Sequence, residues 1–427
     1  MTPAKGFAEM KDSGIEWVGM IPNHWTTIAN KYVMHKEKHI CEKWDGQDVL
    51  SLTMNGVIIR DILNPVGKMP TTFDGYQFAY AGELLMCLFD IDVTPRCVGR
   101  VFNDGVTSPA YSCFQLNDNA DLGYFYYYYL MVDNTKELLH LAKNLRHSFT
   151  EEQLGQLKVP LPPLQEQSAI ASYLDTQCAK IDEIIAQAKA SIEDYKQWKA
   201  SIIYEAVTKG LDPNVEMKDS GIEWIGKIPK QWGTKQIRYL FELRDERNDL
   251  PLEQVNLISL YTDLGVVQHS DLEKITGNKA VTADGYKQVY PNDIVVNIIL
   301  CWMGAIGMSN YAGVTSPAYD VYKPKDSQVT LSKYYHYLFR TARFNGKCYT
   351  VGRGIMAMRW RTYSSEFRAI KVPVPSYKTQ VQIVEYLDSV CSKIDDLISE
   401  KQSLIDNLES YKKSLIYEVV TGKRRVI

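Results

Sequence analysis

The stretch MKDSGIEWVGMIPNHW at residues 10–25 occurs twice, because it returns as MKDSGIEWIGKIPKQW at residues 217–232. The word GVTSPAY at residues 105–111 likewise returns letter for letter at residues 313–319. Words that recur in the same order at a nearly constant shift mark an internal repeat. The chain is therefore predicted to consist of two copies of one unit, each about half of the 427 residues.

The two copies are arranged as if a ring had been cut just before the leader word. After SIIYEAVT at 201–208 the first copy runs into the leader at 217–232, whereas little follows SLIYEVVT at 414–421 in the second copy. The leader missing there stands at the amino terminus. We therefore expect residues 1–25 to pack beside the end of the second copy as residues 210–232 pack beside the end of the first. This circular arrangement predicts a pseudo-twofold, a symmetry usually given by a homodimer.

Each copy is predicted to end in a long helix, the first at residues 164–208. No glycine or proline occurs from Gln165 to Lys209, and Gly210 follows. The apolar residues of both helices follow heptads, which indicates an antiparallel coiled coil of roughly 60 Å. The alternative is that each helix lies on its own domain as an ordinary amphipathic helix. The heptads are broken at Lys199, Lys401 and Lys412, and the predicted core residues are Leu174, Cys178, Ile181, Ile185, Ile192, Ile202, Leu387, Cys391, Ile394, Ile398, Ile405, Leu408 and Leu415.

The remaining parts are predicted to be globular domains with mostly β cores, which gives an α+β fold class. Short β-branched and aromatic runs bounded by turn residues indicate strands. These runs are Val49–Leu52, Gly56–Ile59, Glu83–Leu88, Val255–Leu260 and Asp293–Leu300, and helices are predicted at Tyr124–Leu141 and Leu331–Phe344. The predicted organisation is a first domain at 1–160 with leader 10–25, a helix at 161–209, a second domain at 210–373 with leader 217–232, and a helix at 374–427.

Composition is that of an ordinary folded protein, with 45% apolar and 23% charged residues and a net charge of −3. The eight cysteines form no C-x-x-C pair, which favours a reducing compartment. No apolar run is long enough for a membrane span. These observations predict a soluble, cytoplasmic protein.

The sequence also lacks the common catalytic signatures. There is no P-loop, no G-x-S-x-G and no Asn/Asp-Pro-Pro-aromatic word for adenine methylation. His35 and His39 lie four residues apart, but the glutamate between them is one place late for a zinc-protease site. We expect neither catalysis nor a bound metal.

In its order of leader, variable domain and long helix, the chain resembles the specificity subunit of type I restriction-modification systems. The resemblance is carried by KDSGIEWVGMIPNHW, GVTSPAY and the helix start VPLPPLQEQSAIASYLD, with VPVPSYKTQVQIVEYLD as a weaker second copy. It implies that each domain is a target-recognition domain that reads one half of a bipartite double-stranded DNA site, and that the helices set the spacing. The subunit itself is then non-catalytic.

The resemblance also implies partners and cofactors. Two modification subunits, which bind S-adenosylmethionine and methylate adenine, are expected to dock on the chain. Restriction subunits are expected to add ATP- and Mg-dependent translocation and cleavage. No cofactor is expected on this chain. The second helix start reads VPSYKTQ where the first reads LPPLQEQ, so the two helix starts differ where modification subunits would dock.

Charge is distributed unevenly between the copies. Residues 1–160 carry 14 basic and 19 acidic side chains, whereas residues 213–373 carry 21 and 16. Residues 340–371 hold eight basic side chains against Glu366 alone. Arginine and lysine bind phosphates, and arginine grips guanine with two hydrogen bonds. The predicted DNA-binding residues are Arg340, Arg343, Lys347, Arg353, Arg359 and Arg361 in the second copy, and Arg60, Lys68, Arg96, Arg100, Lys143 and Arg146 in the first.

A rival hypothesis is a structural scaffold, in which two protein-binding domains are held apart by the same coiled coil. It explains the repeat and the heptads, but it does not explain the cluster of arginines.

Overall fold

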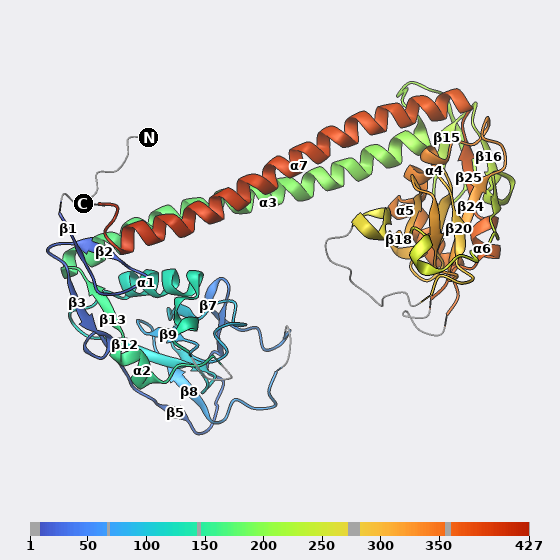
Figure 1. Ribbon diagram of the computed structural model, residues 1–427. Coiled ribbons are helices and arrows are strands. Elements are labelled where there is room, and N and C mark those ends of the chain that lie inside the picture. The colour runs from blue at the N-terminus through green and yellow to red at the C-terminus, as the bar shows by residue number, and fades with distance from the viewer. Residues whose placement is uncertain (1–8, 66–68, 143–146, 272–281, 355–359, 427) are drawn as a thin grey trace. The chain divides into compact units, whose positions relative to one another are not determined.

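A computed structural model of the chain describes residues 9–65, 69–142, 147–271, 282–354 and 360–426 (Figure 1). It divides into a first unit, Met1–Lys189 with Gln402–Ile427, and a second unit, Ala190–Lys401. Each unit contains one globular domain and half of each long helix. The division falls inside the helices, and not at their ends, because each half-helix packs on a globular domain.

In the first unit a four-stranded antiparallel sheet forms the core, in the order β10-β9-β12-β4. A second sheet has the order β11-β8-β5, and the pairs β1-β2, β3-β13 and β6-β7 complete the unit. The strands are β1 (Met10–Asp12), β2 (Met20–Pro22), β3 (Thr26–Ala29), β4 (Met34–Lys36), β5 (Ile40–Cys41), β6 (Leu50–Thr53), β7 (Gly56–Ile59), β8 (Tyr76–Ala79), β9 (Leu84–Met86), β10 (Val98–Arg100), β11 (Gly105–Thr107), β12 (Ser112–Leu116) and β13 (Lys158–Leu161).

The second unit repeats this topology, except that β5 has no counterpart strand beside β20 in the part of the chain that the structure describes. Its main sheet has the order β22-β21-β24-β17, and β20 pairs with β23 as β8 pairs with β11. The strands are β14 (Met217–Ile222), β15 (Gly226–Pro229), β16 (Gly233–Gln236), β17 (Phe241–Leu243), β18 (Ile258–Tyr261), β19 (Gly265–Gln268), β20 (Lys287–Val289), β21 (Ile294–Asn297), β22 (Ile306–Met308), β23 (Gly313–Thr315), β24 (Tyr319–Pro324) and β25 (Lys371–Val374). All five predicted strands overlap observed ones, and the α+β fold class is confirmed.

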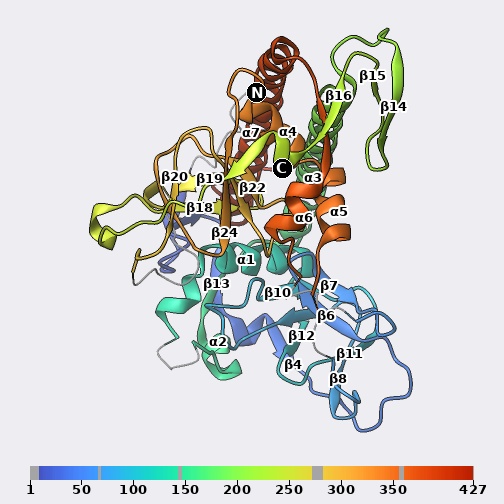
Figure 2. The same cartoon turned by 90° about the vertical axis from the view of Figure 1, so that its right-hand side faces the viewer.

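The predicted helix Tyr124–Leu141 is too long. Helix α1 ends at Thr135 because Lys136 adopts a left-handed conformation with φ 53°. Figures 1 and 2 show α1 lying over the main sheet of the first unit. The short helices of this unit are α1 (Leu122–Thr135), α2 (Glu151–Gln156), η1 (Asn30–Tyr32) and η2 (Glu137–His140).

The predicted helix Leu331–Phe344 is in fact two helices. The first ends at Phe339, and the side chain of Thr341 caps the next by accepting a hydrogen bond from the Phe344 amide. The short helices of the second unit are α4 (Ser332–Phe339), α5 (Ala342–Val351), α6 (Ser364–Ala369), η3 (Ile237–Tyr239), η4 (Leu252–Gln254), η5 (His269–Asp271) and η6 (Cys301–Met303).

The long helices are α3 (Leu164–Lys209) and α7 (Tyr377–Val420). In both units their halves run antiparallel, as the coiled-coil hypothesis predicts. Of the predicted core residues, Ile202, Ile398 and Leu408 are half-buried and the others are buried. The amphipathic alternative is also partly realised, because residues at the start of each helix pack on the globular domain of the same unit. The pairing and the domain contact therefore use successive stretches of one apolar face.

The lysines at two heptad breaks make matching ion pairs between the helices. Lys199 contacts Asp395 at 2.6 Å in the second unit, and Lys412 contacts Asp182 at 2.6 Å in the first. The two lysine side chains are only 27% and 26% exposed. A polar residue at a core position of a coiled coil fixes its register at a cost in stability. We infer that these pairs align the two helices.

We expect the double substitution Lys199→Leu with Lys412→Leu to raise the stability of the helix pairs by about 1 kcal/mol per site, because leucine fills a heptad core position without desolvating a charge. Thermal unfolding of the full chain, followed by circular dichroism at the helical minimum, measures this. Lys196→Leu is the control, since Lys196 pairs only with Glu193 of its own helix. A lower melting temperature in the double variant would show that the ion pairs themselves stabilise the helices.

Matching contacts hold each globular domain to the helices. Tyr124 donates a hydrogen bond to the Val420 carbonyl in the first unit, and Tyr334 donates one to the Val207 carbonyl in the second. The buried Gln167 binds two backbone groups of the loop before α1 and the Pro162 carbonyl before its own helix. Gln380 likewise binds two backbone groups before α4 and the Pro375 carbonyl. The repeated words therefore correspond to shared scaffold.

The leader segments pack where the circular repeat predicts. In the first unit Lys423 donates to the Val18 carbonyl, and a Cβ on Gly422, whose φ is +70°, would lie 2.4 Å from Cδ of Pro22. In the second unit Gly210, with φ +80°, lies against Trp232 in the same way. Each long helix thus ends on the leader of its own unit.

Candidate nucleic-acid interface

The basic cluster predicted in the second copy lies on and after helix α5. Figure 2 shows α5 and α6 next to one another in this unit. The backbones of Arg353 and Arg361 exchange two hydrogen bonds of 2.9 Å, so the chain after α5 turns back on itself before α6. Arg359 lies outside the described residues. The described exposed residues of the cluster therefore lie on α5 and at Arg353 and Arg361.

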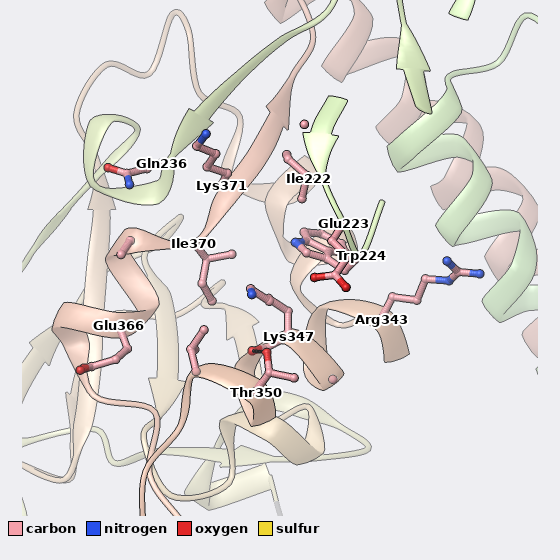
Figure 3. A pocket seen from close by; sticks show the side chains of 14 residues that line it. Ile222, Glu223, Trp224, Gln236, Arg343, Lys347, Thr350, Glu366, Ile370 and Lys371 are labelled. Atoms are coloured by element: carbon pink, nitrogen blue, oxygen red, sulfur yellow. Dashed lines mark hydrogen bonds between the residues drawn. The ribbon is translucent and has the colours of Figure 1, made fainter. Parts of the chain in front are cut away.

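A groove of about 900 Å³ lies beside this cluster, between the β14–β15 hairpin, α5, α6 and the start of β25 (Figure 3). Lys347 reaches into it between Ile370 and Trp224, whereas Arg343 extends away from it. Lys371 and Glu366 stand on its far rim. The groove is thus lined by one tryptophan, by cations and by two acidic residues, Glu223 and Glu366.

Four of the predicted side chains of the second copy remain exposed or partly exposed on this surface. Arg353 is 72% exposed and pairs with Glu366. Arg343 lies 4.8 Å over the ring of Tyr204. The structure gives Lys347 and Arg361 no ion-pair partner within the part of the chain that it describes. These cations are available to a polyanion.

Arg340 serves the fold instead. Its guanidinium donates to the carbonyls of Ile306, Thr262 and Asp263 at 2.8–3.0 Å, which ties the end of α4 to strand β22 and to the loop between β18 and β19. Burial lowers the pKa of Arg340. We assign Arg340 a structural role, which the sequence could not reveal because its three acceptors are distant in the chain.

Arg100 has a similar structural role in the first unit. It makes two hydrogen bonds to Asp175 of α3, and it lies 4.6 Å over the ring of Tyr126. Although burial opposes its charge, hydrogen bonding to Asp175 keeps the pKa of Arg100 above the ordinary value. Tyr127 donates to the same carboxylate at 2.8 Å. Arg100 therefore joins the domain to the helix.

The other predicted residues of the first unit are not gathered into a cluster that the structure describes. Arg60 and Arg96 are half-buried. Lys68, Lys143 and Arg146 lie outside the described residues. The described basic surface is thus concentrated in the second unit, as the charge counts predict.

An aromatic stack at the edge of this surface was not predicted from the sequence. It consists of Trp302, Tyr349 and Trp360, whose rings follow one another without a gap. No sequence pattern marks these three residues, because they come from separate parts of the second unit.

The description "Type I restriction modification DNA specificity domain" belongs to a family model that matches residues 86–194 and 229–407, more than half of the chain. A curated relative, the putative type I restriction enzyme MjaX specificity subunit of Methanocaldococcus jannaschii, is 32% identical over 119 residues. That match covers 27% of this chain and 26% of the relative, so it spans only about a quarter of the relative's length.

Two solved structures share the fold. One chain comes from a study of complex assembly and conformational transition of the type I R-M system, with a TM-score of 0.68, 12% identity, and coverage of 94% of this chain and 98% of that one. The HsdS subunit from Thermoanaerobacter tengcongensis gives a TM-score of 0.51 at 13% identity, with the same two coverages. At these identities the likeness concerns the fold, and the family rests on the two matched segments. By those segments, the chain belongs to the type I restriction modification DNA specificity domain family.

Proposed function

We propose that this chain is the non-catalytic specificity subunit of a type I restriction-modification complex, in which each globular domain reads one half of a bipartite DNA site. The two long helices set the distance between the half-sites. No helix among the described residues is long and apolar enough to cross a membrane.

One observation supports this proposal above all: the two units share their scaffold and differ on their surface. The buried threonine of GVTSPAY makes the same hydrogen bond in both, from Thr107 to the Leu50 carbonyl and from Thr315 to the Ile258 carbonyl. The exposed cations around α5 are described only in the second unit. Two domains that recognise different half-sites need the same fold but different DNA-contacting surfaces.

The proposed partners are double-stranded DNA, two modification subunits and restriction subunits. S-adenosylmethionine belongs to the modification subunits, and ATP and Mg belong to the restriction subunits. The starts of the two long helices differ in their bonding: Glu166 accepts hydrogen bonds from His24 and Trp25, whereas Thr379 bonds to Ser376. We infer that modification subunits meet two different surfaces at these helix starts.

Co-expression with a type I modification subunit, followed by mapping of methylated adenines in genomic DNA, tests the proposal. We expect a co-purified complex and methylation confined to one bipartite sequence. A complex that forms without sequence-specific methylation would favour the scaffold hypothesis.

We expect Arg361→Ala to weaken DNA binding of the complete complex by about 1 kcal/mol and to lower the slope of the salt dependence by about one, because one phosphate contact is lost. Binding titrations at several salt concentrations measure both quantities. Lys230→Ala is the control, since Lys230 is also exposed in the second unit but pairs with Glu216 just before the leader. An unchanged affinity and slope would remove Arg361 from the interface.

A further inference from the structure

The aromatic stack of the second unit links three separate elements. The ring centroids of Trp302 and Tyr349 lie 5.5 Å apart, and those of Tyr349 and Trp360 lie 5.1 Å apart with an angle of only 25° between the planes. Tyr349 is 49% exposed, and the neighbouring Met303 is 51% exposed. We call Trp302, Tyr349 and Trp360 the aromatic platform.

Local contacts hold the platform in place. Trp360 donates a 3.0 Å hydrogen bond to the carbonyl of Tyr349. A Cβ on Gly352 would lie 2.4 Å from Nε1 of Trp360, so the indole rests directly on a backbone without a side chain. The residues that follow are bonded to α5 as well, because buried Thr362 donates to the Cys348 carbonyl at 3.1 Å. Contacts of this kind restrict side-chain freedom before binding, which lowers the entropic cost of binding.

The charged residues around the platform indicate what kind of partner it binds. Arg361 follows Trp360 directly in the sequence, and the backbone of Arg353 is hydrogen-bonded to the backbone of Arg361. Lys347 precedes Tyr349 by two residues. An exposed apolar patch usually marks a binding surface. Flat aromatic faces flanked by cations fit a partner that is both anionic and aromatic, and nucleic acid has this combination.

The corresponding place in the first unit has different chemistry. The bonds from the Phe149 amide to the Leu88 carbonyl and from the Thr362 amide to the Ile298 carbonyl are equivalent, and they align the two units here. When positions are counted from these two bonds, His147 corresponds to Trp360 and Asp92 corresponds to Trp302. The side chains of His147 and Asp92 lie 4.0 Å apart. The scaffold is kept, but a histidine and an aspartate stand where the second unit has two tryptophans.

We propose that the aromatic platform is a sequence-specificity determinant of the second domain: its rings contact base edges and sugars of one half-site, while Arg361, Arg353 and Lys347 hold the adjacent phosphates. This inference rests on the proposed function, and it assigns the sequence discrimination of one half-site to named side chains. Thymine methyl groups and sugar faces are the apolar surfaces that duplex DNA offers to such rings.

The test uses the complete complex of this chain with its modification subunits. Methylation and binding are measured on duplex libraries in which either half-site is randomised, for the wild type, Trp360→Ala and Tyr349→Ala. We expect both variants to lose about tenfold of the discrimination at one half-site and none at the other. Tyr239→Ala, an exposed tyrosine of the same unit (62%), is the matched control and should behave as the wild type.

A second measurement needs no variant of the platform. Duplexes with 5-bromodeoxyuridine at each thymine of the target are photo-crosslinked to the wild-type complex, and the modified residues are identified by mass spectrometry. Crosslinks at Tyr349 or Trp360 from one half-site are expected. Their absence, together with unchanged discrimination in both variants, would overturn the platform while leaving the proposed function intact.

Other outcomes separate the two proposals. If the wild-type complex itself shows no sequence preference, the proposed function fails. If the variants keep their discrimination but no longer co-purify with the modification subunit, the platform binds protein and the inference is overturned.

Discussion

Replacing Lys287 with methionine is expected to lower the free energy of unfolding of the second unit by about 3–5 kcal/mol, because it leaves a buried carboxylate without its cation. Lys287 contacts Asp320 at 3.0 Å, and the side chains are 7% and 8% exposed. Asp320 keeps hydrogen bonds from Tyr322 and Ser364, which place the loss at the lower end of this range. Hydrogen exchange of peptides from β20 and β24 in the full chain measures the loss within this unit.

The first unit provides the control for this prediction. Gln77 corresponds to Lys287, because the first is paired with Thr107 and the second with Thr315. Ser112 corresponds to Asp320, because the first pairs with β9 and the second with β21. One copy therefore has two neutral residues, Gln77 and Ser112, at the positions where the other has an ion pair. The double substitution Lys287→Gln with Asp320→Ser should recover most of the stability. If the double variant is less stable than Lys287→Met, the ion pair would be a net stabilising contact.

Gln167→Leu and Gln380→Leu are each expected to cost about 3 kcal/mol, because three backbone groups lose their partner in a buried place. Gln167 accepts from the Asp121 amide at 2.8 Å and donates to the Asn119 and Pro162 carbonyls at 3.0 and 2.9 Å. Loss of this clamp should free the globular domain from the start of the long helix. Faster hydrogen exchange in the loop before α1, or before α4 for Gln380→Leu, is the readout.

Gln165→Leu is the matched control for the clamp, since Gln165 is exposed two residues earlier on the same helix. A surface substitution of this kind changes stability by less than about 0.5 kcal/mol. Equal exchange in Gln165→Leu and Gln167→Leu would show that the clamp contributes nothing. We also expect Gln380→Leu to impair recognition of one half-site only, because it acts in one unit.

Much of the fold followed from patterns that are local in the chain. The heptads of α3 and α7 and the alternating strand runs are set by neighbouring residues, so their existence was predicted correctly. The break at Lys136 was not, because a left-handed residue in the middle of a helical pattern is stabilised by its surroundings. Lys136 binds the carboxylate of Asp133 and the Thr94 carbonyl. Such contacts are formed only in the folded domain.

The candidate site was predicted less completely for the same reason. A run of arginines in the sequence located the basic surface of the second unit. The individual arginines of this run, however, have different roles in the folded unit. Arg361 is exposed, whereas Arg340 is bonded to carbonyls 34, 77 and 78 residues away. Trp302 and Tyr349 come from different elements, η6 and α5, and their rings meet only in the folded unit.

Repetition and periodicity are properties of the linear chain, and they were enough to establish a circularly arranged repeat with two long helices and two β-rich domains. Which charges are exposed, and which are used inside the fold, became known only from the folded units. There the heptad-breaking Lys199 and Lys412 pair across the helices, and Arg100 and Arg340 join elements. Whether a charged side chain is free to bind a partner depends on the residues that folding brings next to it. These neighbours cannot be identified from their positions in the sequence.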